Sequence, residues 1–316
     1  MELAEVIFKA EKDIRPILKE TPCEFSQSLS DADTEVFLKL ENLQYTGSFK
    51  LRGATNKLLS LSDADKARGV VTASSGNHGA ATAYAGTKLG VKVLVFVPEH
   101  ASVAKIEAIK RFGADVRLYG DDGVITERYA RSYAKGLDMP YISPYNDLDV
   151  VSGQGSVGVE LMRQCEGLDA VFIATGGGGL IAGTAAALKS VNQCLRVIAC
   201  SPQNSAVLIE SLKAGKILDL PSLPTLSDGT AGGVEEGSVT FELCQNLVDE
   251  YVLVTEDEIK TSLKQFIAEE HMLIEGAAAV AIAAFQKTRT KYKNKKVALV
   301  ICGANISLDD LKKVIE

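Results

Sequence analysis

Short apolar runs alternate with longer segments of helical periodicity along most of the chain. Such alternation indicates parallel β-sheets covered by helices, so the sequence predicts an α/β fold. The runs predicted as strands are 36–40, 69–73, 91–97, 115–118, 141–142, 170–174, 196–200 and 297–301. The segments predicted as helices are 1–14, 51–60, 78–89, 101–112, 123–136, 152–165, 180–190, 256–269 and 276–285.

The predicted strands fall into two groups, which indicates two sheets. Strands between about residues 69 and 141 would form one sheet, and those near residues 36, 170, 197 and 297 the other. The segment 221–237 interrupts the pattern with prolines and glycines. A loop of this length is often functional, although a plain surface excursion explains the sequence equally well.

The composition is that of an ordinary globular protein, with 316 residues, 46% hydrophobic, 24% charged and a formal net charge of −7. This acidic balance argues against a nucleic-acid partner. The longest apolar stretch, 276–285, is too short for a membrane span of about 20 residues, and residues 1–14 lack a signal-peptide pattern. The six cysteines form no C-x-x-C pair. We therefore expect no zinc site or disulfide framework and a reducing, cytoplasmic setting.

Four consecutive glycines, 176–179, lie between a predicted strand and a predicted helix. Glycine lets the backbone approach an anion closely, and the N–H groups and dipole of a helix start favour negative charge. Leu180 breaks the spacing of a dinucleotide fingerprint, and the Gly-Lys-Ser/Thr of a P-loop is absent. We interpret the stretch as a phosphate cradle rather than a flexible turn.

Lys50 lies where a predicted helix begins, in the stretch SFKLRGA of residues 48–54. A cation at a helix N-terminus is electrostatically disfavoured, which helps to lower its pKa, as a Schiff-base lysine requires. Taken alone, an exposed surface lysine is the more common explanation. The neighbouring motifs favour the catalytic interpretation.

Two more motifs follow the ends of predicted strands. The stretch SSGNHG, residues 74–79, offers hydroxyls, an amide and free backbone N–H groups to a carboxylate, and Asn77 can donate to a phenolate-like oxygen. The plainer interpretation, compatible with the first, is that Ser74 or Ser75 caps the following helix. The stretch ICGAN, residues 301–305, places Cys302 after the last strand, where a buried cysteine is most often part of the core.

In chain order the four motifs are SFKLRGA, SSGNHG, the four glycines and ICGAN, and together they resemble the fold-type II pyridoxal-phosphate enzymes. Within them the chain is most similar to the threonine/serine dehydratases (ammonia-lyases) and the serine racemases, over nearly its whole length. The resemblance implies pyridoxal 5'-phosphate as cofactor, a small amino-acid substrate, a homodimer and a two-domain fold similar to tryptophan synthase β. Each domain would be a mostly parallel sheet flanked by helices. Residues 1–60 plus 147–316 would form the large cofactor-binding domain, and residues 61–146 the small mobile domain.

The resemblance also implies roles for single residues. Lys50 would carry the cofactor as a Schiff base and remove the substrate Cα proton, with Ser75 as a second acid/base on the opposite face. Further cofactor contacts would be Phe49 beside the ring, Asn77 at the ring hydroxyl, Gly176, Gly177, Gly178 and Gly179 at the phosphate, and Cys302 at the ring nitrogen. The substrate would be received by Ser74, Ser75, Gly76, Asn77, His78 and Glu275.

The thiol expected at the ring nitrogen is that of Cys302, and as a neutral group it limits the reactions that the resemblance implies. It does not hold a proton on the ring nitrogen as a carboxylate would, and the weaker electron sink suits elimination better than transamination. The implied activity is α,β-elimination from a β-hydroxyamino acid such as L-threonine or L-serine, giving a 2-oxo acid and ammonia. A serine or hydroxyamino acid racemase with side dehydratase activity is the alternative. β-Replacement, as in cysteine synthases, ranks below both, and a non-enzymatic phosphate binder would lack the visible colour of a bound cofactor.

The chain departs from the family pattern in two places. Serine racemases and some relatives hold a divalent metal through acids after the strand that follows the glycine helix, where Ser201 and Val207 stand here. Neither offers a carboxylate to a hard cation, so no metal site is expected. The chain ends at Glu316, so we expect neither the regulatory domain of biosynthetic threonine dehydratases nor feedback by isoleucine.

Overall fold

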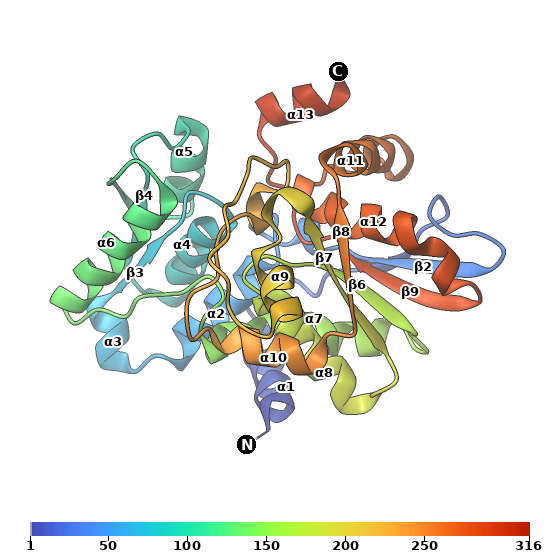
Figure 1. The fold of residues 1–316 in the computed structure, drawn as a ribbon. Coiled ribbons are helices and arrows are strands. Elements are labelled where there is room, and N and C mark those ends of the chain that lie inside the picture. Colours follow the sequence, from blue (N-terminus) through green and yellow to red (C-terminus); the bar gives the residue numbers. More distant parts are fainter. Residues whose placement is uncertain (1) are drawn as a thin grey trace.

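The computed structural model describes residues 2–316. Within this range the strands form a six-stranded sheet of order β1-β2-β9-β6-β7-β8 and a three-stranded sheet of order β3-β4-β5 (Figure 1). Neighbouring strands are parallel except for β1 and β2. The strands are β1 (Cys23–Phe25), β2 (Thr34–Lys39), β3 (Val70–Ala73), β4 (Val93–Val97), β5 (Asp115–Leu118), β6 (Ala170–Ala174), β7 (Arg196–Pro202), β8 (Glu250–Val254) and β9 (Lys295–Val300).

Helices cover both sheets and confirm the α/β prediction. The α-helices are α1 (Leu3–Ile14), α2 (Lys50–Ser60), α3 (Asp63–Arg68), α4 (Asn77–Leu89), α5 (Val103–Arg111), α6 (Gly123–Gly136), α7 (Leu148–Gln164), α8 (Gly179–Val191), α9 (Val207–Ala214), α10 (Val239–Leu247), α11 (Glu256–Glu270), α12 (Gly276–Thr288) and α13 (Leu308–Ile315). Short 3-10 turns are η1 (Glu41–Leu43), η2 (Gln203–Ser205), η3 (Asp228–Thr230) and η4 (Arg289–Tyr292).

Strand β4 shows how the apolar pattern builds a two-sided layer. Successive side chains of a strand point to opposite faces. Val93, Val95 and Val97 therefore pack in the core under α4 and α5, whereas Leu94 and Phe96 pack with Ala130 and Ala134 of α6. A strand that is buried on both faces is a continuous run of apolar residues, as β4 is.

In the larger sheet, α7 and α8 pack together on one side, and α11 and α12 pack together on the other (Figure 1). Strand β6 lies between β9 and β7 and is buried along its whole length. The carboxyl ends of the parallel strands β6 and β9 therefore meet at one edge of the sheet, where ligand sites of α/β proteins form.

The two expected groups of strands are confirmed as two sheets. The expected strand at 141–142 is reduced to an isolated bridge between Tyr141 and Val71. The domain boundaries near residues 61 and 146, and the mobility of the smaller part, stay predictions. Elements that the sequence pattern did not reveal are β1, α3, α9, α10, β8 and α13.

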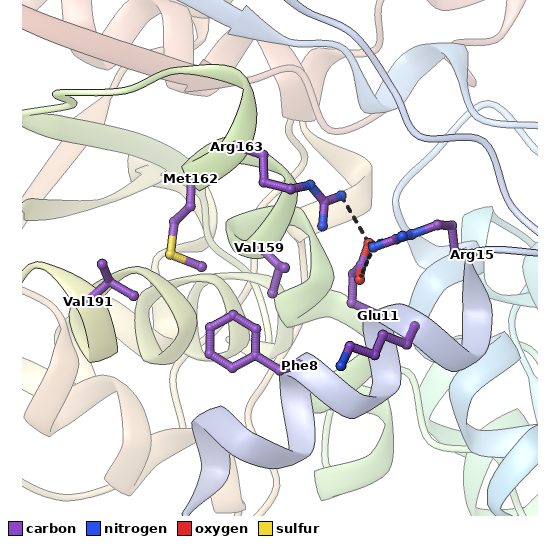
Figure 2. Close-up of a pocket in the computed structure, with 8 residues that line it drawn as sticks. Phe8, Glu11, Arg15, Val159, Met162, Arg163 and Val191 are labelled. Carbon is purple, nitrogen blue, oxygen red and sulfur yellow. Dashed lines mark hydrogen bonds and ion pairs between the residues drawn. The ribbon is translucent and has the colours of Figure 1, made fainter.

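A groove with a volume of about 320 Å³ lies between α1, α7 and α8 (Figure 2). Its walls include Phe8, Val159 and Met162, and Glu11 at its edge accepts hydrogen bonds from Arg15 and Arg163. None of the site residues expected from the sequence lines it. In residues 2–316, no helix is both long and apolar enough to cross a membrane.

Candidate active site

The sequence-predicted motifs meet at the carboxyl ends of β6 and β9. The glycine loop follows β6 and Cys302 follows β9, two strands that are hydrogen-bonded to each other. The loop before Lys50 is tied to the same edge, because the Phe49 N–H donates to the Cys302 carbonyl over 3.1 Å. Helices α2, α4, α8 and α12 begin at Lys50, Asn77, Gly179 and Gly276, so the site gathers several helix N-termini.

Lys50 is the first residue of α2, as the sequence predicted. Its Nζ donates to the carbonyl oxygen of Pro144 over 2.9 Å and lies 5.3 Å from the centre of the Phe49 ring. Within the described chain, no carboxylate forms a salt bridge with it. The side chain is partly exposed, but desolvation by surrounding protein lowers the pKa of the amine to about 8, against the opposing influence of Cys302 and Glu275.

Cys302 and Glu275 form the buried floor beside the amine. The Cys302 Sγ lies 4.0 Å from Glu275 Oε1. Burial, reinforced by the nearby Glu275 carboxylate, raises the pKa of the Cys302 thiol well above its ordinary value, so the thiol is neutral. Glu275 immediately precedes α12, and burial raises the pKa of its carboxyl to about 7.

Asn77 is held by a side-chain network. Its Nδ2 donates to both carboxylate oxygens of Glu275 over 2.9 and 3.0 Å, and its Oδ1 accepts from Asn305 Nδ2 over 2.6 Å. Asn305 also donates to the Thr46 carbonyl and, through its backbone N–H, to Glu275. The sequence interpretation gave Asn77 a contact with a ring hydroxyl, and this role stays a prediction.

The turn before α4 differs from one of the expectations. Gly76 is the N-cap of α4 and no side chain caps the helix, so the prediction that Ser74 or Ser75 caps it is wrong. The physical reason is a tight turn in which Ser74 Oγ accepts from the Gly76 N–H over 3.1 Å, before the helix begins. Without a side-chain cap, N–H groups of the first turn of α4 remain for a ligand carboxylate.

His78 lies in that first turn, and its imidazole is buried against the backbone at Ile142. The side chain is 3% exposed, and its Nε2 lies 3.0 Å from the Ile142 carbonyl oxygen. Burial, followed by the charge of Lys50, lowers the pKa of His78 to about 3, so the ring is neutral. The imidazole of His78 therefore offers no positive charge to a carboxylate, and its expected contact with the substrate stays a prediction.

The glycine loop forms a tight cradle at the start of α8. Gly178 has a φ of +87° and is the N-cap of α8, again without a side-chain cap. A Cβ on Gly177 would lie 2.4 Å from the Tyr145 ring, and one on Gly176 would lie 2.7 Å from the Thr230 carbonyl oxygen. Only glycine fits these positions, and the uncapped helix start suits a phosphate. The residues present therefore fit a phosphate-bearing cofactor with an aldehyde for the lysine.

Several residues of the site had no clear signal in the sequence. Asn305 ends the ICGAN stretch, and its position after the last strand was the only pointer to it. Pro144 and Tyr145 precede α7, and their contacts depend on the tertiary fold. Thr230 comes from the 221–237 segment, so that segment borders the glycine loop and is not a plain surface excursion.

Comparison with known proteins decides the family. A profile of the family described as pyridoxal-phosphate dependent enzyme matches residues 14–303. The chain belongs to the pyridoxal-phosphate dependent enzymes. It is 37% identical to an L-threonine ammonia-lyase of Thermotoga maritima over 314 residues, covering 98% of this chain and 77% of that protein. It is 38% identical to the catabolic L-threonine dehydratase TdcB of Staphylococcus aureus, covering 98% of this chain and 91% of the relative.

The solved structures agree with the family. Maize serine racemase superposes with a TM-score of 0.92 at 30% identity, covering 98% of this chain and 95% of the other. The fold is that of the fold-type II members, as the motifs implied, and the cofactor of this pyridoxal-phosphate dependent enzyme is pyridoxal phosphate. In residues 2–316, no group of three or more His, Cys, Asp or Glu side chains is arranged to hold a metal ion.

Proposed function

We propose that this chain is an ammonia-lyase that removes water and ammonia from L-threonine or L-serine, with pyridoxal phosphate attached to Lys50. The observation that carries this proposal is an amine of lowered pKa without a carboxylate partner in the described residues, beside the neutral Cys302 thiol. The dehydratases among its relatives support the same activity.

Different residues of the site would bind different parts of the cofactor. Gly176–Gly179 and the start of α8 would bind the phosphate, and Cys302 would face the ring nitrogen without protonating it. When bound, pyridoxal phosphate withdraws electrons from the substrate Cα, so that its proton becomes acidic and the β-hydroxyl can leave.

Lys50 would take the Cα proton. A lysine of pKa about 10.5 is about one part in a thousand unprotonated at pH 7.5, whereas a pKa of about 8 leaves about a quarter unprotonated. The Pro144 carbonyl orients the amine without giving it a countercharge. Ser75 and the uncapped N-terminus of α4 would hold the substrate carboxylate.

Reduction with borohydride tests the attachment. The wild-type protein should lose its visible cofactor band and carry the added mass on the peptide containing Lys50. The K57A variant, which changes another lysine of α2, serves as a control and should behave like wild type. Added mass on any other lysine would contradict the assignment.

Product assay tests the activity. Incubation with L-threonine should give 2-oxobutanoate and ammonia in equal amounts, and L-serine should give pyruvate. No 2-oxo acid from threonine, serine or 3-hydroxyaspartate would refute the proposal.

Racemisation is the second candidate, and Ser75 favours it. This serine lies partly exposed in the turn before α4, and maize serine racemase has a closely similar fold. If Ser75 serves as the second acid/base, S75A should stop formation of D-serine from L-serine while elimination continues. Absence of D-serine with the wild-type protein would remove this candidate.

We also propose a homodimer of two-domain chains, with residues 61–146 as the smaller mobile domain, working in the cytoplasm. Sedimentation velocity should give twice the mass of 33.7 kDa. Hydrogen exchange in residues 61–146 should slow when substrate is present if that domain closes over the site. Cell fractionation would test the location.

A further inference from the structure

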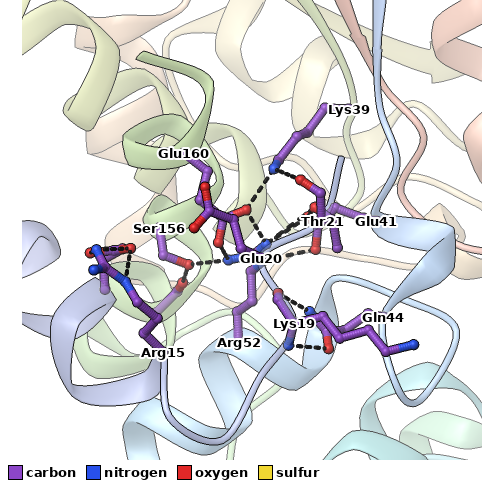
Figure 3. A network of polar contacts seen from close by, with 12 residues as sticks. Arg15, Lys19, Glu20, Thr21, Lys39, Glu41, Gln44, Arg52, Ser156 and Glu160 are labelled. Atoms are coloured by element: carbon purple, nitrogen blue, oxygen red, sulfur yellow. Dashed lines mark hydrogen bonds and ion pairs between the residues drawn. The ribbon is translucent and has the colours of Figure 1, made fainter. Parts of the chain in front are cut away.

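Arg52 lies two residues after Lys50 and is fully buried among other charged groups (Figure 3). Its Nε and Nη2 donate to Glu41, each over 2.8 Å. Its Nη1 and Nη2 donate to Glu160 over 2.6 and 2.7 Å. Glu41 belongs to η1, next to β2, and Glu160 belongs to α7, so one guanidinium joins three segments.

Lys39 completes this group, which we call the Arg52 cluster: Lys39, Glu41, Arg52 and Glu160. Lys39 Nζ donates to Glu160, to the Thr21 carbonyl and to Gln164. Burial opposes ionisation of Glu160, but Arg52 outweighs it and holds the pKa of Glu160 below its ordinary value. Two cations thus balance two carboxylates. A balanced buried cluster adds little net stability over apolar side chains, but it can fix one geometry.

Glycines bring α2 and α7 into contact beside this cluster. A Cβ on Gly153 of α7 would lie 2.6 Å from the Arg52 carbonyl oxygen, and one on Gly53 would lie 2.4 Å from Gln154. The Gly53 N–H also donates to Gln154 over 3.2 Å. Helix α2 carries Lys50, and α7 begins at Leu148, soon after Pro144. The relative position of these two helices therefore sets the contact between the Lys50 amine and the Pro144 carbonyl.

We propose that Arg52 is a positioning residue that fixes α2 against α7 and thereby holds the Lys50 amine at the Pro144 carbonyl. The inference rests on the proposed role of Lys50, which borohydride mapping of the wild-type protein tests separately. Lysine at position 52 keeps the charge but loses the planar fork that reaches both carboxylates. A displacement of about 1 Å in a catalytic group can cost about 10²-fold in rate.

The test compares R52K with K39M. The K39M variant removes the other cation of the cluster but leaves the hydrogen bonds of Arg52 to Glu41 and Glu160 in place. For R52K we expect kcat for threonine elimination to fall about 10²-fold with KM within about threefold, whereas kcat of K39M stays within about threefold of wild type. Equal losses of kcat in both variants would overturn the proposal.

A second readout uses the apoprotein and needs no turnover. Competitive acetylation, followed by mass spectrometry of the Lys50 peptide, reports how the reactivity of this amine changes with pH. In wild type the reactivity should level off near pH 8, and in R52K the midpoint should move toward the ordinary value for lysine. An unchanged midpoint in folded R52K would overturn the proposal.

If R52K does not fold, E160Q keeps the shape of the cluster and replaces one carboxylate by an amide. Its kcat should fall at least about tenfold, and the midpoint of Lys50 labelling should move in the same direction as expected for R52K. Wild-type values of both quantities in E160Q would overturn the proposal. If the wild-type protein carries no cofactor on Lys50, the proposed role of Lys50 itself is refuted instead.

Discussion

Lys50 and Arg52 lie on the same turn of α2 but in opposite electrostatic surroundings. Arg52 meets two carboxylates, whose attraction outweighs its burial and raises its pKa, so that it is held as a cation. Lys50 has only a carbonyl oxygen as hydrogen-bond partner in the described part of the chain, and desolvation lowers the pKa of its amine to about 8.

The difference between these neighbours lies in the partners that the fold supplies. Burial alone disfavours both charges, and a carboxylate at hydrogen-bonding distance reverses the outcome for Arg52. The active site contains the complementary case in Glu275, a buried carboxyl whose hydrogen-bond partners are amides and a thiol rather than cations. The reactive groups of this chain, Lys50 and Glu275, have no hydrogen-bond partner of opposite charge among residues 2–316. The structural group Arg52 is paired with two carboxylates.

The largest expected effect comes from K50A. Removing the proposed base should lower the rate of 2-oxobutanoate formation from L-threonine by about 10⁴-fold. The urea unfolding midpoint of the apoprotein should not decrease, because no described ion pair is lost with this amine. A large loss of stability in K50A would show that the amine is a structural cation after all.

The next effect concerns the paired region. E41Q removes one carboxylate and leaves the Arg52 cluster with an excess of buried positive charge, so the free energy of unfolding should fall by about 3–5 kcal/mol. D13N, in the exposed pair of Lys9 and Asp13, is the matched control and should change stability by less than about 1 kcal/mol. Urea titrations measure both, and equal effects would mean that the cluster is not electrostatically isolated from water.

Glu275 gives a pH-dependent effect of intermediate size. With a folded pKa of about 7, above the unfolded value of about 4.3, the folded protein keeps a proton that the unfolded chain releases. The associated stability is fully present below about pH 4.3 and is lost as the pH rises through 7. Between pH 5 and 8, apoprotein stability relative to E275Q should therefore fall by on the order of 2–3 kcal/mol. A difference that does not vary with pH would contradict this.

The smallest effect is expected at an exposed pair. Lys105 of α5 donates to Asp228 of η3 over 3.0 Å, and the Asp228 side chain is 62% exposed. Because water screens such a pair, K105M should change the free energy of unfolding by less than about 1 kcal/mol. A loss above about 2 kcal/mol would place this pair with the buried cluster rather than with the surface.

The sequence predicted those parts of the site that could be inferred from local residue chemistry together with the order of the strands. The glycine loop and Cys302 follow adjacent parallel strands, so their meeting follows from the alternation of strands and helices. The start of α2 at Lys50 was also predictable, and it confirms the expected electrostatic position. Caps were less predictable, because Ser74 forms a local turn that competes with capping α4.

Long-range polar partners could not be predicted. Glu160 lies 108 residues from Arg52, and Pro144 lies 94 residues from Lys50, and nothing in their local patterns marks them as partners. Strand β8 was missed for a related reason. It lies at a sheet edge, and its mixed exposure gives neither a clean alternation nor a continuous buried run.

The contact between Lys50 and residue 144 has a consequence for genetics. Its acceptor is a backbone oxygen, which every amino acid supplies. A mutational scan of position 144 would therefore report the fit of the side chain and the bend of the chain, and it would not register the loss of this hydrogen bond. Amino-acid substitutions at position 144 during evolution also leave the acceptor in place, since replacing the side chain does not remove the backbone oxygen.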